Sequence, residues 1–131
     1  MKWICDTNVI SEVFKKKPSP KIMDWLSDQT EIVLSVITVE EVYYGLAGKN
    51  AQKQIAWLGD FIGYRCQVFP VTGKIAEQGG VLRGNLRRQG LTKSQPDILI
   101  AATAIHHGLG VATRNERDFK DCGVPIMNPF R

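Results

Sequence analysis

The sequence predicts an α/β protein in which a central parallel sheet of four to five strands is flanked by helices in a three-layer sandwich. Two patterns lead to this prediction. Short apolar runs rich in β-branched residues alternate with longer segments whose apolar residues recur at helical spacing. Capping residues, prolines and glycines separate the two kinds of segment. Strands that are joined through helices pair in parallel, and helices then cover both faces of the sheet.

The composition is that of one folded domain, residues 1–131, because 44% of the residues are hydrophobic and 23% are charged. The longest apolar runs, such as 98–105, are far shorter than the roughly 20 residues of a membrane span. Asp6 lies where a secretion signal would need apolar residues, so we expect a cytoplasmic protein. The net charge of +4 permits a polyanionic partner. The three cysteines are an odd number and show no paired short spacing, so we expect buried, reduced thiols at Cys5, Cys66 and Cys122.

The chain is predicted to begin with a short apolar strand at 2–6. A helix at 8–14 follows and ends before Pro18. Ser19 then caps a helix over 20–28, which has a proline at its first position.

The run at 32–36 is rich in β-branched residues and predicts the second strand. Thr38 and Glu41 have the spacing of a capping box, which predicts a helix over 38–48. Apolar residues at core spacing predict another helix over 52–64.

The second half begins with a strand at 67–71. Thr72 caps a long helix that runs to residue 89 and closes at Gly90. A very apolar helix over 96–107 ends at a glycine. The remaining elements are short: a strand at 110–113, a helical turn at 116–120 and a strand at 124–127.

Acidic and amide side chains follow the carboxyl ends of the predicted strands. Asp6 ends the first strand, Glu41 follows the second, and Asp97 lies in the first turn of the apolar helix. Asn115 and Asp118 come directly after the fourth strand. Ligands of open parallel sheets bind at the edge formed by these strand ends, so we expect the five side chains to meet there.

Carboxylates that meet at one site repel each other, and a divalent cation removes the repulsion. Oxygen donors without a convergent histidine or cysteine favour Mg²⁺, or Mn²⁺, over zinc. The chemistry that matches is metal-dependent hydrolysis of a phosphodiester bond. Each acid also has a structural interpretation: Glu41 as partner of a Thr38 cap, Asp97 as a helix-dipole partner with Ser94 as cap, and Asp118 as a solvated turn residue. Their joint placement favours the metal site.

Four segments, in order, resemble the motifs of PIN-domain ribonucleases, specifically the VapC-type toxins and the related FitB proteins. These segments are 4–12, 35–45, 96–104 and 111–119, and the ending 128–130 resembles the FitB-like branch. The resemblance implies that Asp6, Glu41 and Asp97 bind the metal and are catalytic. It selects Glu41 over Glu40, because the family acid stands four residues before a glycine.

In the fourth motif this chain has Asn115 where many relatives have an aspartate. Either Asp118 supplies the fourth acid, as a further catalytic residue, or Asn115 orients a water molecule. Thr7 and Thr113 are expected to be neutral neighbours of the metal site, or simply backbone caps.

The resemblance implies a Mg²⁺-dependent endoribonuclease that is the toxin of a type II toxin–antitoxin pair. Its expected partners are RNA, a VapB-like antitoxin, a second copy of the chain in a homodimer, and DNA only through the antitoxin. Basic residues on and after the long helix either contact RNA phosphates or form a solvated helix face: Arg83, Arg87, Arg88 and Lys93. The alternative function is a catalytically idle module that pairs with an antitoxin to bind DNA.

Overall fold

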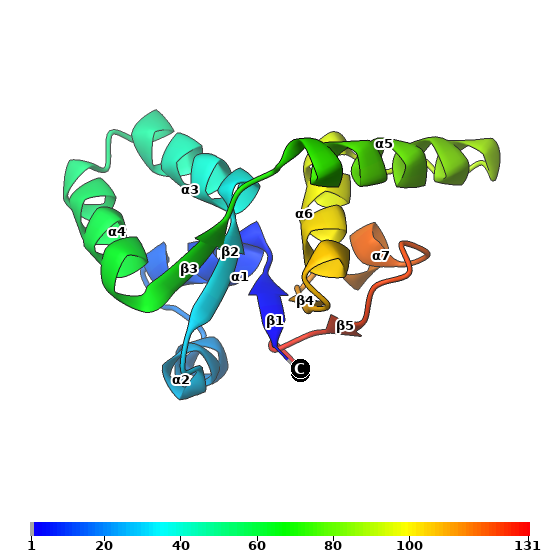
Figure 1. The fold of residues 1–131 in the computed structure, drawn as a ribbon. Helices are drawn as coiled ribbons and strands as arrows, with labels where there is room; N and C mark the ends of the chain where they lie inside the picture. Colours follow the sequence, from blue (N-terminus) through cyan, green and yellow to red (C-terminus); the bar gives the residue numbers. More distant parts are fainter. Residues whose placement is uncertain (1) are drawn as a thin grey trace.

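A computed structural model describes residues 2–131 and contains one five-stranded sheet in which all neighbouring strands are parallel (Figure 1). The strand order is β3-β2-β1-β4-β5. The strands are β1 (Trp3–Cys5), β2 (Ile32–Ser35), β3 (Cys66–Phe69), β4 (Gly110–Ala112) and β5 (Ile126–Met127). The predicted fold class is therefore confirmed, with five strands.

The helices cover both faces of this sheet, and three of them begin at the predicted caps. Ser19, Thr72 and Ser94 each accept a hydrogen bond from a backbone N–H in the first turn of the following helix. The helices are α1 (Thr7–Ser11), the 3₁₀ helix η1 (Glu12–Phe14), α2 (Pro20–Asp28), α3 (Val36–Gly48), α4 (Gln52–Arg65), α5 (Gly73–Arg88), α6 (Gln95–His106) and α7 (Glu116–Phe119).

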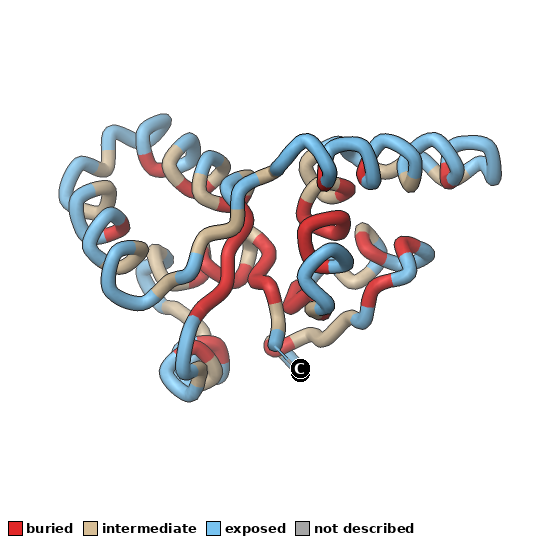
Figure 2. Tube along the Cα trace, viewed as in Figure 1, coloured by how far each residue is buried: buried red, intermediate tan, exposed pale blue. Residues whose placement is uncertain are grey.

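Alternate side chains of the central strands enter two separate cores. Ile4 and Val33 pack with α6 and α7 in one core, whereas Cys5 and Leu34 pack with α1 to α4 in the other. Figure 2 shows the buried residues concentrated in the central strands and in α6. This arrangement is the predicted three-layer sandwich, and it fixes the carboxyl ends of β1, β2 and β4 at one edge.

The predicted start of α3 is wrong. The helix begins at Val36, and the Ser35 side chain accepts its capping hydrogen bond from the backbone N–H of Ile37. Thr38 is fully buried inside the helix, and its hydroxyl lies 3.5 Å from the carbonyl oxygen of Cys5. The pattern Thr-x-x-Glu therefore does not form a capping box here, and Glu41 is free to make other contacts.

Other differences concern boundaries and one cysteine. The predicted helix 8–14 is split into α1 and η1, and the last strand has two residues. Cys5 and Cys122 are buried thiols as predicted, but Cys66, at the start of the edge strand β3, is only half-buried. Within residues 2–131, no helix has the length and apolar character needed to span a membrane.

Candidate active site

Asp6 follows β1 directly and is held by three hydrogen bonds. Its Oδ1 accepts the backbone N–H of Thr7 at 2.8 Å, which caps α1. Its Oδ2 accepts the hydroxyl of Thr113 at 2.8 Å and the side-chain amide of Asn8 at 3.0 Å. Only 5% of the residue is exposed. A carboxylate is thus fixed at the carboxyl edge of the sheet, where the sequence predicted it.

Burial raises the pKa of Asp6 to about 6. The hydrogen bonds from Thr113 and from the Thr7 backbone lower the pKa, but they offset only part of the effect of burial. The negative charges of Asp97 and Glu41 raise it further. Asp6, Asp97 and Glu41, from three separate elements, therefore influence one another electrostatically.

Glu41 is on α3 and is half-buried, whereas the adjacent Glu40 is exposed. Its Oε1 accepts the hydroxyl of Thr7 at 2.6 Å. Thr7 therefore links Glu41 to the first turn of α1, beside Asp6. The orientation of α3 therefore agrees with the choice of Glu41 over Glu40. Glu41 is held by its contact with Thr7 and not by a capping box with Thr38.

Asp97 lies in the first turn of α6 and is half-buried. Its backbone N–H donates to the Ser94 hydroxyl, so the predicted cap is present. Burial raises the pKa of Asp97. The negative charges of Asp118 and Glu41 raise this pKa further. The hydrogen bond with the Ser94 hydroxyl and the positive charge of Lys93 lower it. Asp118, on α7, thus belongs to the same group of interacting acids.

The fourth motif contributes Thr113 and Asn115 in different ways. Thr113 is fully buried, and its oxygen accepts the backbone N–H of Asn115 at 2.9 Å while its hydroxyl donates to Asp6. Asn115 precedes α7 and is exposed, with no side-chain capping bond to that helix. Thr113 therefore orients Asp6, whereas the structure gives the Asn115 side chain no such contact.

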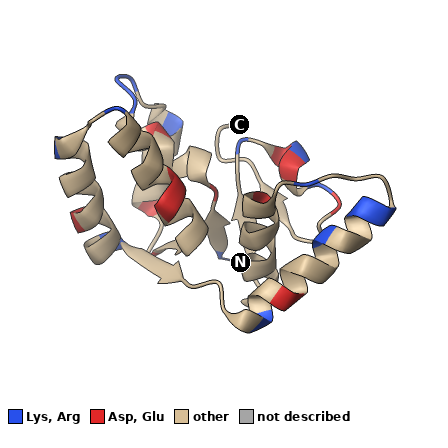
Figure 3. Ribbon diagram, turned by 90° about the horizontal axis from the view of Figure 1, so that it is seen from above, with Lys and Arg blue, Asp and Glu red and all other residues tan. Residues whose placement is uncertain are grey.

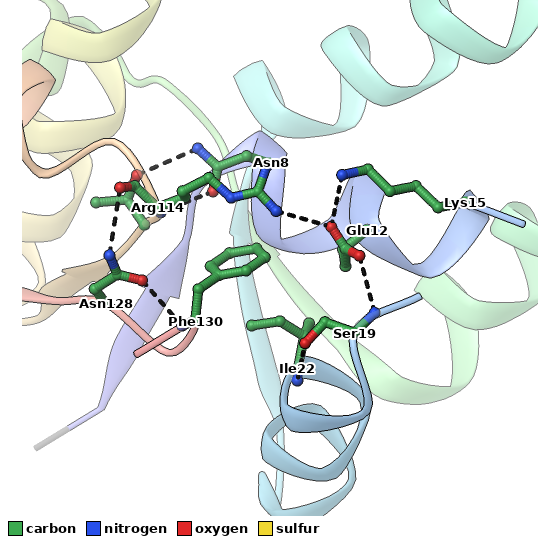
Figure 4. A network of polar contacts seen from close by, with 9 residues as sticks. Asn8, Glu12, Lys15, Ser19, Ile22, Arg114, Asn128 and Phe130 are labelled. Carbon is green, nitrogen blue, oxygen red and sulfur yellow. Dashed lines mark hydrogen bonds and ion pairs between the residues drawn. The ribbon is translucent and has the colours of Figure 1, made fainter. Parts of the chain in front are cut away.

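Three residues of the quoted motifs were assigned no role from the sequence. Asn8 bonds to Asp6, and its Oδ1 accepts the backbone N–H of Arg114 at 3.0 Å. The Arg114 side chain donates to Glu12 at 3.0 Å (Figure 4). The motifs contain all three residues, but their contacts depend on the pairing of β1 with β4.

The donor set suits a hard cation, although the carboxylates do not form a closed cage. Among residues 2–131, no three His, Cys, Asp or Glu side chains are grouped closely enough to hold an ion by themselves. The ion pairs in this part of the chain involve Glu12 and Glu116, so none neutralises Asp6, Glu41, Asp97 or Asp118. Viewed from above, acidic segments lie in α3, at the end of β1, at the start of α6 and in α7 (Figure 3). Such a set fits Mg²⁺, which keeps several water ligands and binds through few carboxylates.

Of the predicted basic residues, Lys93 interacts with this group of acids through Asp97, and the three arginines lie on α5. Arg83, Arg87 and Arg88 are exposed on α5. Arg83, Arg87 and Lys93 line a groove together with Gly80, Gly84, Leu91 and Thr92. The Lys93 ammonium donates to the carbonyl oxygen of Arg117 at 2.8 Å, and its charge acts on Asp97. Arg88 is not part of this groove.

The chain belongs to the PIN domain family, whose sequence profile matches residues 3–124. Its relatives are toxin ribonucleases of the VapC and FitB type. The chain is 33% identical to VapC ribonuclease Y4jK of Sinorhizobium fredii, over 97% of this chain and 96% of that protein. It is 31% identical to toxin FitB of Neisseria gonorrhoeae, over 97% of each chain. The structure superposes on DNA-bound VapBC from Salmonella typhimurium with a TM-score of 0.88, at 30% identity and 98% coverage of both chains.

Proposed function

We propose that this chain is a Mg²⁺-dependent endoribonuclease that acts as the toxin of a type II toxin–antitoxin system. The observation that supports this most directly is the state of Asp6. Its buried carboxylate is oriented by Thr7, Asn8 and Thr113 and interacts with two further acids, with no basic side chain paired to it among the described residues. The ribonuclease relatives and the PIN domain match favour this activity over other metal-dependent hydrolyses.

Asp6, Glu41 and Asp97 would hold Mg²⁺, or Mn²⁺, directly or through water. When bound, the ion would supply Lewis-acid chemistry for phosphodiester hydrolysis and would lower the pKa of a water molecule. Asn8 and Thr113 keep Asp6 aimed at the cation site, and Thr7 orients Glu41. Glu41 accepts the proton of the attacking water. Asp118 is the better candidate for the fourth acid, because its charge acts on Asp97 and Asn115 cannot supply one.

The test of this function is cleavage of total RNA by the purified protein with and without Mg²⁺. We expect endonucleolytic products with Mg²⁺ or Mn²⁺ and none with excess EDTA. Restoring Mg²⁺ after EDTA should restore cleavage. Cleavage that persists undiminished in EDTA, or no cleavage with either ion, would contradict the proposal. In the second case the alternative of an idle module that pairs with an antitoxin would be favoured.

The proposed function also implies a protein partner and, through it, DNA. Structural neighbours include FitAB bound to a DNA fragment and VapBC2 from Rickettsia felis bound to a promoter fragment. We propose that this chain also pairs with a VapB-like antitoxin and reaches DNA only through it. An apolar groove between α2 and α4 suits an antitoxin helix, since Met23 and Trp57 line it and are 38% and 48% exposed. The homodimer and the cytoplasmic location stay predictions.

We expect the groove on α5 to bind the RNA backbone. Replacing Arg83 and Arg87 with alanine should weaken RNA binding and reduce the slope of log K against log salt by about 0.7 for each lost phosphate contact. Binding is measured in EDTA, where the RNA stays intact. Lys21→Ala, an exposed change on α2, is the matched control. An unchanged slope in the double variant would show that the two arginines form a solvated helix face.

A further inference from the structure

The sequence segment at 128–130 and the residues Glu12 and Arg114 take no direct part in the proposed reaction. They form a connected network beside the site (Figure 4). Glu12 is 4% exposed, and its carboxylate accepts hydrogen bonds from the Arg114 guanidinium at 3.0 Å and from the backbone N–H of Ser19 at 2.9 Å. The Lys15 ammonium lies 2.9 Å from the same carboxylate. A buried carboxylate with these partners is fixed in position.

The surroundings of Glu12 favour its ionised form. Burial opposes its charge, but the hydrogen bonds from Lys15 and Ser19 and the charges of Lys15 and Arg114 together lower the pKa of Glu12 below its usual value. The Glu12 carboxylate faces the Arg114 guanidinium at 3.0 Å. Because Glu12 follows α1 directly, it is rigidly connected to the helix that Asp6 caps.

Arg114 is held on four sides. Its side chain bonds to Glu12, and its guanidinium carbon lies 4.0 Å from the centre of the Phe130 ring. Its backbone N–H donates to Asn8 at 3.0 Å, and its carbonyl oxygen accepts the side-chain amide of Asn128 at 3.4 Å. The side-chain Oδ1 of Asn128 in turn accepts the backbone N–H of Phe130 at 2.9 Å. The segment 128–130 thus fixes the turn between β4 and α7.

This turn presents the two groups that orient Asp6. Thr113 precedes Arg114 and donates its hydroxyl to Asp6. Asn8 donates to the same oxygen of Asp6 while accepting the Arg114 backbone N–H. A displacement of Arg114 therefore disturbs both donors together.

We infer that Arg114 is a positioning residue, which Glu12 and Phe130 hold so that Asn8 and Thr113 orient the Asp6 carboxylate. The expected effect of Arg114 on catalysis rests on the proposed function. The role of Arg114 in orienting Asn8 and Thr113 is independent of that function. Groups that orient metal ligands typically change metal affinity or activity by about 10–100-fold when they are removed. Arg114 is 45% exposed at its side chain, so its removal leaves no large cavity.

The test compares Arg114→Ala and Arg114→Lys with Arg131→Ala. Arg131 is the matched control, because it also makes an ion pair, to Glu116 at 3.1 Å, but has no contact with Asn8 or Glu12. Three quantities are measured on the full chain: Mn²⁺ affinity by calorimetry, hydrogen exchange of the amides at 113–118, and RNA cleavage. Thermal unfolding shows whether each variant is folded.

For Arg114→Ala we expect about 10–100-fold weaker Mn²⁺ binding, faster exchange at 113–118, and a parallel loss of cleavage. Arg114→Lys should recover part of each quantity, and Arg131→Ala should resemble the wild type. If Arg114→Ala proves unfolded, Phe130→Leu removes the ring face and should weaken Mn²⁺ binding by about 2–5-fold.

Loss of cleavage with unchanged Mn²⁺ affinity and unchanged exchange would overturn the inference, because Arg114 would then contact RNA directly. Equal losses in Arg114→Ala and Arg131→Ala would overturn it as well. If the wild type cleaves no RNA with any metal, the proposed function fails, whereas faster exchange at 113–118 in Arg114→Ala would still support the positioning role.

Discussion

Replacing Asp6 with asparagine is expected to abolish Mg²⁺-dependent RNA cleavage while leaving the protein folded. Asparagine has the same shape as aspartate but no negative charge to offer a cation. The bound metal is worth several kcal/mol to the transition state, so the expected loss of activity is about 10²–10⁴-fold. Cleavage of a defined RNA at saturating Mg²⁺, with circular dichroism to confirm folding, measures it.

The variant should not lose stability in the absence of metal. The introduced asparagine would keep the hydrogen bond from the Thr7 backbone, and the Thr113 hydroxyl can turn to accept one. The new amide group would face the Asn8 amide, which lowers the free energy of unfolding by about 1 kcal/mol. Removal of the buried charge raises the free energy of unfolding by more than this near pH 7. The matched control is Asp24→Asn, an exposed change on α2. Full metal-dependent cleavage by Asp6→Asn would refute the assigned role of Asp6.

The position of this acid could be predicted because it follows from topology. Strands separated by helices pair in parallel, and the ends of β1, β2 and β4 then lie at one edge. Asp6 and Glu41 follow the ends of β1 and β2 closely in the sequence, and Asp97 lies in the first turn of α6, which leads into β4. The same reasoning cannot give distances, and it left open whether Asn115 or Asp118 completes the group.

The errors came from choices that only tertiary packing decides. Ser35 and Thr38 are both acceptable caps, and local rules favour Thr38 because a glutamate stands three residues later. The chain begins α3 at the earlier residue because Thr38 is buried next to the end of β1. A fully buried threonine cannot remain at an exposed helix start.

Thr7 and Thr113 were expected near the metal site, but Asn8 and Arg114 were missed for a related reason. Asn8 and Arg114 are 106 positions apart and meet only because β1 pairs with β4. Neither residue differs in type from those of ordinary surface loops. Their roles could be inferred from the sequence only if the strand register and the turn geometry were already known.

The pH dependence of stability provides a test of Asp6 that needs no RNA. The ordinary pKa of 3.8 applies to the unfolded chain, whereas in the metal-free folded protein the pKa of Asp6 is about 6. Between these values the folded state binds more protons than the unfolded state, so the free energy of unfolding falls as pH rises. The expected loss from this group is roughly 3 kcal/mol, complete above pH 6.

Glu12 acts in the opposite direction, because its lowered pKa adds stability that is lost as the pH falls. The contribution of Asp6 is therefore measured as the difference between the wild type and Asp6→Asn, by urea unfolding in EDTA from pH 4 to pH 8. We expect this difference to change by roughly 3 kcal/mol, with the wild type losing stability relative to the variant as pH rises. Saturating Mg²⁺ should reverse the trend, since it binds the ionised carboxylate and stabilises the folded wild type more at pH 7 than at pH 5. If the difference in free energy of unfolding between the two proteins stays constant from pH 4 to pH 8 in EDTA, the Asp6 carboxylate is not desolvated. Burial would then not explain why Asp6 needs a cation.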